Sequence, residues 1–249
     1  MLKIELLTTG DELLEGVISD TNATHIAREL QQLGLTAQRI NTVGDSLKEL
    51  SSTLTEISQR ADICVMTGGL GPTSDDLTLD ALALSARVHL EESEPLWAEI
   101  QAFYRGLGRE APLTNRRQAR VPQGGTPLKS EVGTAPGMRL KVGDCLVFAY
   151  PGVPSELKWH LNQSLLPYLQ GRLGLTLHKR QLRVGLLGES ALQELINTLS
   201  VEQDAVEGLK VGYQALGAEV RLKLSAPSSE QLDHFISCLK PRLGDFLIS

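Results

Sequence analysis

The sequence is poor in cysteine and contains no long apolar run. Its 249 residues include three cysteines, and no two of them form a Cys-x-x-Cys pair. Nothing in this pattern suggests a disulfide framework or a zinc site, and a reducing compartment fits it. No segment reaches the roughly 20 apolar residues of a membrane span. Lys3 and Glu5 interrupt the apolar start that a signal peptide requires, so we expect a cytoplasmic protein.

A basic surface is also lacking. The formal net charge is −6, and no run of Lys and Arg is longer than two residues. Nucleic-acid binding needs a basic face that displaces counterions, so this class of partner is not expected. The hydrophobic content of 41% and the charged content of 22% describe an ordinary globular protein. We therefore expect a small-molecule partner, and neither a nucleic acid nor a membrane.

Strands and helices alternate in the first third of the chain. Apolar patterns predict strands over residues 2–8, 35–43 and 63–66 and a helix over residues 22–33. Ser46 and Glu49 have the spacing of a capping box, which predicts a second helix from Ser46. Strand and helix alternation is typical of parallel sheets. We therefore predict an α/β fold with a mostly parallel sheet and helices on both faces.

The rest of the chain predicts one closing segment and a second unit. Gly143-Asp144 suits the turn of a hairpin over residues 138–149, and a helix over residues 155–169 closes the first domain. After a linker near residues 171–179 the pattern is that of a small α+β domain. Its predicted elements are a strand over 181–187, a helix over 190–199, strands over 209–214 and 218–225, and a helix over 229–243. The predicted domains are residues 1–170 and 180–249.

Four unusual segments follow the predicted parallel strands. They are Thr8-Thr9-Gly10-Asp11-Glu12, Gly44-Asp45, the run from Thr67 to Asp76, and Pro151-Gly152-Val153-Pro154. In open parallel sheets, ligands bind at the carboxyl ends of the strands, where such loops converge. The convergence of four segments carries more weight than any one of them, and it predicts a ligand site at this edge.

The longest segment resembles a phosphate-binding loop. Gly68, Gly69 and Gly71 follow a buried strand and allow the backbone amides to approach a ligand closely. A helix that begins near residues 76–78 directs its positive end to the same place. The Gly-Lys-Ser/Thr end of a P-loop is missing, and the spacing Gly-x-Gly-x-x-Gly does not occur there.

Two carboxylates take the place of the missing lysine. Asp75 and Asp76 would repel a phosphate by about 4 kcal/mol per pair at 4 Å with an effective dielectric constant near 20. A Mg²⁺-like ion between carboxylate and phosphate oxygens removes the conflict, so the loop predicts a phosphate site with a metal ion. In the alternative interpretation, Asp75 caps the helix and Asp76 lies in its first turn.

The other candidate residues have equally simple alternatives. Asp45 and the Asp11-Glu12 pair can be turn or cap residues, and Asn22 can be a first-turn residue. Glu156 either binds metal or favours a helix N-terminus. Arg116 and Arg117 are typical of a solvated face, although arginine also suits phosphate recognition.

Seven ordered blocks of the chain together resemble the CinA (competence/damage-inducible protein) family. The blocks are Thr9 to Leu14, Asp20 to Ala23, Thr42 to Asp45, Thr67 to Thr78, Asn115 to Ala119, Val132 to Gly137, and Pro151 to Glu156. The resemblance implies a molybdopterin-binding fold of the MoeA/MogA type for the first domain and a small KH-like second domain. Gly185-Leu186-Leu187-Gly188 matches the KH signature superficially, but Glu189 follows and no basic cluster flanks it, so RNA binding is not expected.

The resemblance also implies an activity, namely hydrolysis of ADP-ribose to AMP and ribose 5-phosphate. A divalent ion (Mg, Mn or Co) would assist, with potassium as a further candidate, and the family implies a homodimer. The implied roles are catalysis for Asp45, Asp75 and Asp76; metal binding for Asp75, Asp76 and Glu156; phosphate contact for Gly68, Gly69, Gly71 and Thr73; and a nucleotide pocket lined by Asn22, Pro151 and Gly152. The general base stays unassigned.

Two rival hypotheses belong to other classes. The first is a binding module that holds molybdopterin or a nucleotide without turnover, because this fold is shared with molybdenum-cofactor proteins. The second is a scaffold whose site has decayed. CinA proteins also continue into a C-terminal domain that deamidates nicotinamide mononucleotide. The chain ends at Ser249, where that domain would begin, so we expect no deamidase activity from it.

Overall fold

The computed structural model describes residues 2–174, 178–202, 208–216 and 219–248. The chain divides into two compact units, Met1–Pro167 and Tyr168–Ser249. The division falls inside a helix, a few residues before the linker that the sequence suggested near residues 171–179. No helix among the described residues has both the length and the apolar character needed to cross a membrane.

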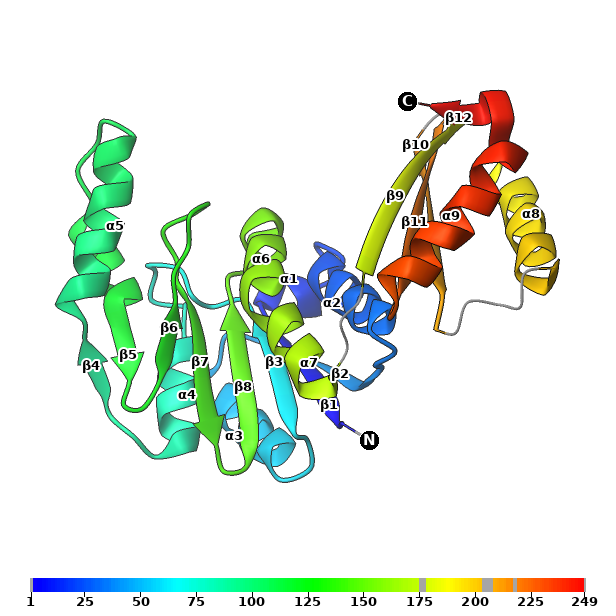
Figure 1. The fold of residues 1–249 in the computed structure, drawn as a ribbon. Coiled ribbons are helices and arrows are strands. Elements are labelled where there is room, and N and C mark those ends of the chain that lie inside the picture. The colour runs from blue at the N-terminus through cyan, green and yellow to red at the C-terminus, as the bar shows by residue number, and fades with distance from the viewer. Residues whose placement is uncertain (1, 175–177, 203–207, 217–218, 249) are drawn as a thin grey trace. The chain divides into compact units, whose positions relative to one another are not determined.

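The first unit is built on a six-stranded sheet in the order β2-β1-β3-β8-β7-β6 (Figure 1). Strands β2, β1, β3 and β8 are parallel, and β7 and β6 run antiparallel to β8 and β7. The bounds are β1 Ile4–Thr9, β2 Ala37–Val43, β3 Ile63–Thr67, β6 Thr126–Leu128, β7 Gly137–Val142 and β8 Cys145–Tyr150. Every residue of β1 and β3 is buried, as expected for central strands covered on both faces.

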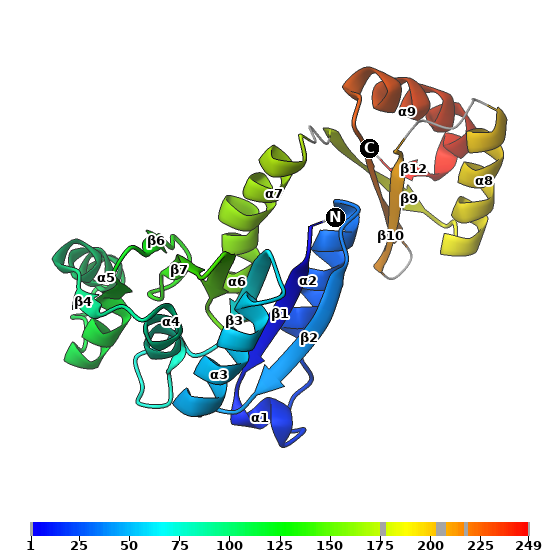
Figure 2. The same ribbon diagram turned by 90° about the horizontal axis from the view of Figure 1, so that it is seen from below.

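Helices cover both faces of this sheet, which confirms the predicted α/β class (Figures 1 and 2). Helices α2 and α6 lie on one face, and α3 and α4 lie on the other. Their bounds are α2 Thr21–Gln32, α3 Leu47–Ser58, α4 Thr78–Ala86 and α6 Pro154–His160. After α6 the chain continues through a π-helical turn, Leu161–Leu165, into α7, Leu166–Leu173. Ser46 caps α3 by accepting from the Glu49 amide, as the capping box predicts.

Several short elements escaped sequence-based prediction. A four-residue helix α1 (Asp11–Leu14) follows β1, and a two-stranded sheet pairs β4 (Leu90–Glu92) with β5 (Arg120–Pro122). Between them lie helix α5 (Glu94–Gly106), which the sequence does predict around Pro95–Tyr104, and a 3₁₀-helix, Leu113–Ala119. Leu96, Trp97, Ile100 and Ala119 form a small separate core under this part of the unit.

The second unit has a four-stranded antiparallel sheet in the order β10-β11-β9-β12. Its elements are β9 His178–Gly185, α8 Glu189–Glu202, β10 Lys210–Leu216, β11 Glu219–Ala226, α9 Ser229–Leu243, a 3₁₀-helix Gly244–Phe246 and β12 Leu247–Ile248. The predicted elements recur with shifted ends, and β12 is an addition. Residues 175–177 of the predicted linker lie outside the described residues, whereas α7 extends to Leu173 and β9 begins at His178.

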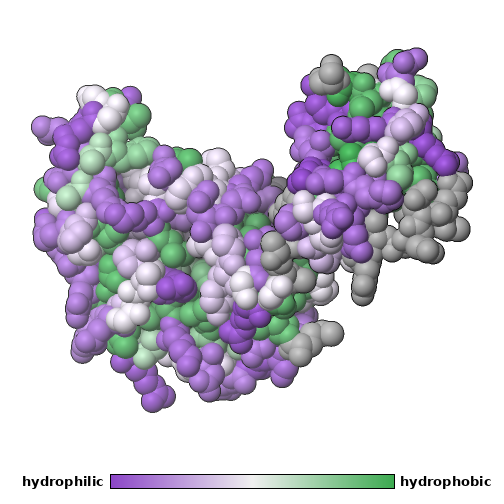
Figure 3. Space-filling view, in the orientation of Figure 1, coloured by the Kyte–Doolittle hydropathy of each residue, from purple (hydrophilic) through white to green (hydrophobic). Residues whose placement is uncertain are grey.

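Surface and interior differ in the expected way. On the face shown in Figure 3, apolar side chains are visible over part of the first unit, with hydrophilic side chains around them.

The buried interior contains an acidic side chain that the sequence did not single out. Glu5 is 2% exposed in the middle of the sheet. It accepts hydrogen bonds from the Arg60 guanidinium at 2.7 and 2.9 Å and from the Asn41 amide at 3.2 Å.

The ion pair of Glu5 and Arg60 controls the protonation of this buried carboxyl. Burial raises the pKa of Glu5, but the hydrogen bonds from Arg60 and Asn41 outweigh burial and lower the pKa below its usual value. A lowered pKa means that the pair stabilises the fold above the ordinary pKa of a glutamate. This stabilisation is lost as the pH falls through the lowered value.

Replacing Arg60 tests the pair. Arg60→Met leaves a buried carboxylate without its cation, so we expect a loss of about 3 kcal/mol of unfolding free energy at pH 7. The unpaired Glu5 then has a raised pKa, so the loss shrinks as the pH falls toward the ordinary pKa of glutamate. Urea unfolding at several pH values measures both effects. Glu56→Gln, which removes only an exposed partner 3.8 Å from Arg60, serves as the control with less than about 0.5 kcal/mol. An equal loss in both variants would contradict the assigned role of the pair.

Candidate functional site

The carboxyl ends of four parallel strands meet at one edge of the main sheet. Thr8 of β1 is in register with Thr42 of β2 and Thr67 of β3, and Thr67 is in register with Tyr150 of β8. The four segments singled out in the sequence follow these strands. The parallel register therefore brings all of them to the same edge, which is where such sheets bind ligands.

Two aspartates bind each other's backbone at the β1–β2 end of this edge. Asp45 accepts from the Thr9 hydroxyl at 2.9 Å and from the Asp11 amide at 3.3 Å. The Asp45 amide in turn donates to the Asp11 carboxylate at 3.0 Å. A Cβ added to Gly44 would overlap the same carboxylate, so Asp11 could keep this position only beside a glycine. No pattern in the sequence indicated that Asp11 and Asp45 form a pair.

Asn22 connects helix α2 to the ends of β3 and β8. Its side-chain amide donates to the Gly152 carbonyl at 2.7 Å and to the Thr67 hydroxyl at 3.2 Å. The Thr67 hydroxyl donates to the Pro151 carbonyl at 3.0 Å. The predicted neighbours Asn22, Pro151 and Gly152 thus lie together. Asn22 fixes the loop after β8 directly at Gly152 and indirectly, through Thr67, at Pro151.

The glycines after β3 lie where no side chain fits. Gly68 and Gly69 have φ of 104° and 63°, in the region that favours glycine. A Cβ on Gly68 would lie 2.5 Å from the Thr9 carbonyl oxygen, and a Cβ on Gly69 would lie 2.6 Å from the Thr78 hydroxyl. That hydroxyl donates to the Gly68 carbonyl at 2.7 Å. The loop is therefore packed tightly between the end of β1 and the first turn of α4.

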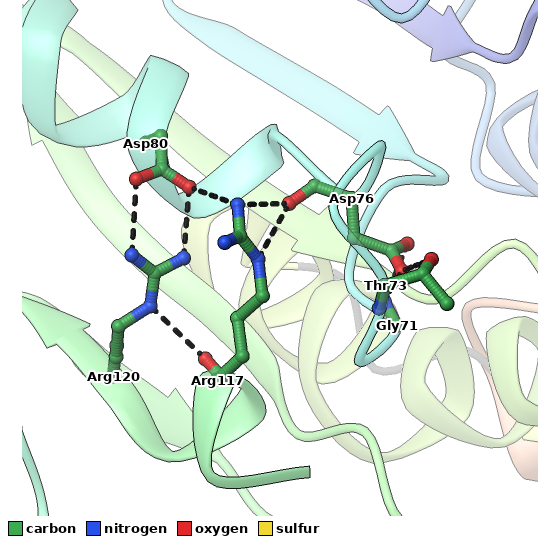
Figure 4. Close-up of polar contacts among 6 residues, drawn as sticks. All are labelled: Gly71, Thr73, Asp76, Asp80, Arg117 and Arg120. Carbon is green, nitrogen blue, oxygen red and sulfur yellow. Dashed lines mark hydrogen bonds and ion pairs between the residues drawn. The ribbon is translucent and has the colours of Figure 1, made fainter. Parts of the chain in front are cut away.

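The carboxylate of Asp76 is bonded within its own loop (Figure 4). Its carboxylate points back into the loop and accepts from the Gly71 amide at 2.7 Å and from the amide and hydroxyl of Thr73 at 2.8 and 2.5 Å. Helix α4 begins at Thr78, so Asp76 precedes it. Three hydrogen bonds from the loop's own donors therefore hold this carboxylate in place. Gly71 and Thr73 use their amides in the same bonds.

An arginine that the sequence placed on a solvated face supports this loop. Arg117 donates to the Asp76 carbonyl at 3.2 Å and to the Asp80 carboxylate at 3.1 Å (Figure 4). The guanidinium of Arg120 also donates to the carboxylate of Asp80, in the first turn of α4, at 2.8 and 3.0 Å. Gln118, from the same 3₁₀-helix as Arg117, donates to the Leu70 carbonyl at 3.1 Å. These bonds fix the loop from the side opposite the Asp76 carboxylate.

Asp75 and Glu156 have contrasting surroundings. Asp75 is exposed, and the Thr73 hydroxyl lowers its pKa. Glu156 is half-buried in the first turn of α6, and burial raises its pKa. One of its carboxylate oxygens is buried without a partner among the described residues. A Cβ on Gly133 would overlap the Glu156 carboxyl group, so this side chain lies directly on the backbone of the segment before β7.

The predicted metal ligands are not gathered into one cluster of side chains among the described residues. No group of three or more His, Cys, Asp and Glu side chains in the described part of the chain is placed to hold one. Asp76 is bonded to its own loop, Asp75 faces solvent, and Glu156 lies against Gly133. We therefore derive no chemical step that involves a metal ion.

Glu156 offers a test by pH. Because burial raises the pKa of Glu156 in the folded protein, the fold is more stable with this side chain protonated than with it ionised. The stability that protonated Glu156 contributes is lost as the pH rises through the raised pKa. Glu156→Gln should therefore unfold at a higher temperature than the unchanged protein at about pH 7.5, and the gap should close toward the ordinary pKa of glutamate, about 4.3. Thermal unfolding across this range measures it, with the exposed Glu110→Gln as control. A gap independent of pH would refute the role of burial.

Fold and site together define an α/β ligand-binding domain with a glycine loop at the carboxyl edge of a mostly parallel sheet. Residues 5–171 match the family described as a probable molybdopterin binding domain. A CinA-like protein of Escherichia coli O9:H4 (strain HS) is 40% identical over 233 residues, 93% of this chain and 57% of that protein. The crystal structure of CinA from Thermoplasma acidophilum, described as having unknown function, is 34% identical with a TM-score of 0.59 and covers 65% of this chain and 94% of that one. The chain belongs to the CinA-like family with a molybdopterin-binding type of domain.

One relative corrects the activity that we expected. A protein of Escherichia coli K12, equally 40% identical over 93% of this chain and 57% of its own length, is named NMN amidohydrolase-like protein YfaY. The name describes an amidohydrolase and not a pyrophosphatase, so the prediction of an ADP-ribose pyrophosphatase is wrong. The chain spans little more than half the length of these relatives. The predicted homodimer, metal ions and KH-like character of the second unit stay predictions.

Proposed function

We propose that the first unit is a binding module for a phosphorylated pterin or nucleotide, which it holds at the carboxyl edge of the main sheet without converting it. The observation that carries this proposal is the state of the backbone amides after β3. Gly69 and Leu70 donate to no partner among the described residues. Backbone amides in a glycine loop are typical ligands of phosphate groups.

Three amides next to these two are already bonded. The Gly68 amide donates to the Tyr150 carbonyl at 3.1 Å, and the Gly71 and Thr73 amides donate to Asp76. Of the four residues that we expected to contact phosphate, only Gly69 therefore has a free amide. Its neighbour Leu70 adds a second one. Because the bonded amides hold the loop in one shape, the remaining donors are presented without a further entropic cost on binding.

Electrostatics favour a phosphate near the ends of β3 and β8. Asp11 and Asp45 lie together at the β1–β2 end of the edge. Each carboxylate repels a phosphate charge by about 2 kcal/mol at 8 Å with an effective dielectric constant of 20. Gly69 and Gly152, close after β3 and β8, have no charge, and the Asp76 carboxylate farther along the loop is bonded to the Gly71 and Thr73 amides. The anionic part of the ligand therefore binds most favourably between these two glycines.

The family match supports a ligand of this class, since residues 5–171 match a probable molybdopterin binding domain. Molybdopterin is a phosphorylated pterin, and a purine nucleotide offers similar ring donors and a similar phosphate. In either ligand the phosphate is the group that the Gly69 and Leu70 amides bind, and the ring system lies farther along the edge.

Isothermal titration of the whole chain with AMP tests the proposal. We expect binding, recovery of AMP unchanged, and an affinity at least tenfold weaker in Gly69→Ala, because its Cβ would displace the Thr78 hydroxyl or the loop. Gly152→Ala should also weaken binding, and it should fold, since its Cβ meets Gly68 only at 3.4 Å. Gly106→Ala, with nothing within 4 Å, is the matched control.

Thermal unfolding shows which variants are folded. Absence of AMP binding by the unchanged chain would overturn the proposal. So would full affinity in a folded Gly69→Ala variant. Conversion of AMP to another compound would contradict the assignment as a binding module.

A further inference from the structure

Three consecutive carbonyl groups of the glycine loop are bound by donors from two other segments. The Gly68 carbonyl accepts from the Thr78 hydroxyl at 2.7 Å, and the Gly69 carbonyl accepts from the Thr78 amide at 3.1 Å. The Leu70 carbonyl accepts from the side-chain amide of Gln118 at 3.1 Å. The loop therefore directs its acceptors toward Thr78 and Gln118, which belong to the protein interior.

The direction of these carbonyls fixes the direction of the amides. In a planar trans peptide the C=O and N–H groups point in opposite directions. The unit that joins Gly68 to Gly69 directs its carbonyl to Thr78, so the Gly69 amide points away from Thr78. The unit that joins Gly69 to Leu70 does the same with the Leu70 amide. These are the two amides of the proposed phosphate site, so a single residue orients both of them.

Thr78 is well placed for this role. It is the first residue of α4 and is 0% exposed. The first amides of a helix have no acceptor within the helix, and the Gly69 carbonyl supplies one to Thr78. The hydroxyl lies against the same turn, since a Cβ on Gly69 would be 2.6 Å from it. Both donors of Thr78 are thus used to hold the loop.

Gln118 fixes the next peptide unit. Its side chain is 2% exposed, and its oxygen accepts from the Asn115 side-chain amide at 2.8 Å. Because the Leu70 carbonyl can only accept, the group that faces it must be the amide nitrogen of Gln118. The N–H of the same peptide unit, that of Gly71, donates to Asp76 at 2.7 Å. This unit is therefore held at both ends.

The bonds to Thr78 matter because the peptide units that they hold are joined by glycines. Gly68 and Gly69 lack a Cβ, so other backbone conformations are open to them at little cost. If the unit between them turned over, its carbonyl oxygen would face the ligand in place of the Gly69 amide. A carbonyl oxygen and a phosphate oxygen are both acceptors and repel each other. The orientation of this unit therefore decides whether the loop attracts a phosphate.

We infer that Thr78, with Gln118 beside it, is a positioning residue that gives the loop its selectivity for an anionic group. The inference rests on the proposed function, in which a phosphate binds at the Gly69 and Leu70 amides. It adds to that function the side chains that determine phosphate selectivity, although neither is expected to touch the ligand.

Titration of the whole chain with AMP and with adenosine, at fixed ionic strength, tests the inference. Adenosine offers the same ring and sugar without the phosphate, so the unchanged chain should bind AMP about tenfold more tightly or better. Thr78→Val keeps the shape of the side chain and removes its hydroxyl. In this variant the ratio of the two affinities should fall to about one, while the affinity for adenosine stays within about twofold. Thr78→Ser keeps the hydroxyl and should keep the ratio.

Two further variants complete the experiment. Gln118→Met fills a similar volume without a donor and should also lower the ratio. Ser85→Ala is the matched control, because Ser85 lies on the same helix as Thr78 and its hydroxyl donates to the Ser51 carbonyl of α3 at 3.1 Å. This control should keep the ratio. Thermal unfolding shows which variants are folded.

The outcomes separate the inference from the proposed function. A folded Thr78→Val variant that keeps the ratio would overturn the inference and leave the binding module intact. Loss of the ratio in Thr78→Ser or in Ser85→Ala would overturn it as well, since neither change removes the hydroxyl that holds Gly68. If Thr78→Val does not fold, a folded Gln118→Met variant with an unchanged ratio refutes it. Equal affinities of the unchanged chain for AMP and adenosine would instead contradict the phosphate site of the proposed function, and the inference would fail with it.

Discussion

The close approach of main chains at the ends of β1 and β3 is the constraint on which the site depends. Gly68 lies so near the Thr9 carbonyl that a Cβ would be 2.5 Å away, and its amide is bonded to the end of β8. Three strands are thereby held together by backbone atoms at this point. With any other residue at Gly68, the strand ends would have to separate, and the loop would lose its shape.

Pre-organisation of the glycine loop follows from bonds on both of its sides. The Asp76 carboxylate accepts hydrogen bonds from the Gly71 and Thr73 amides, while Arg117 donates to the Asp76 carbonyl from the other side (Figure 4). Asp80 then fixes Arg117 through their ion pair. A loop held in this way loses little conformational entropy on binding, so its free amides act as a rigid set of donors for an anion.

Local patterns explain which parts of the fold could be predicted. The cap at Ser46, the buried run of β3 and the turn at Gly143 depend on neighbours in sequence, and the structure has all three. The mostly parallel sheet could be predicted because strands and helices alternate along the chain. Strand ends shifted by a few residues, because pairing with neighbouring strands sets them.

Contacts between distant residues explain what could not be predicted. Glu5 meets Arg60 across 55 positions, and Asp80 meets Arg120 across 40, with no periodic signal to connect them. The adjacent residues Asp75 and Asp76 looked equivalent in sequence, yet one faces solvent and the other its own loop. Their orientation depends on where the chain turns after Gly71, which only the folded loop determines.

The charge along the sheet edge orders the proposed ligand. Asp11 and Asp45 lie at the β1–β2 end, and the uncharged Gly69 and Gly152 follow β3 and β8. The aspartates repel the phosphates of the ligand. The ring amino groups of a pterin or purine are hydrogen-bond donors, which match the aspartate carboxylates. The reverse orientation would place the phosphates beside the aspartates, so one edge of the sheet selects a single orientation.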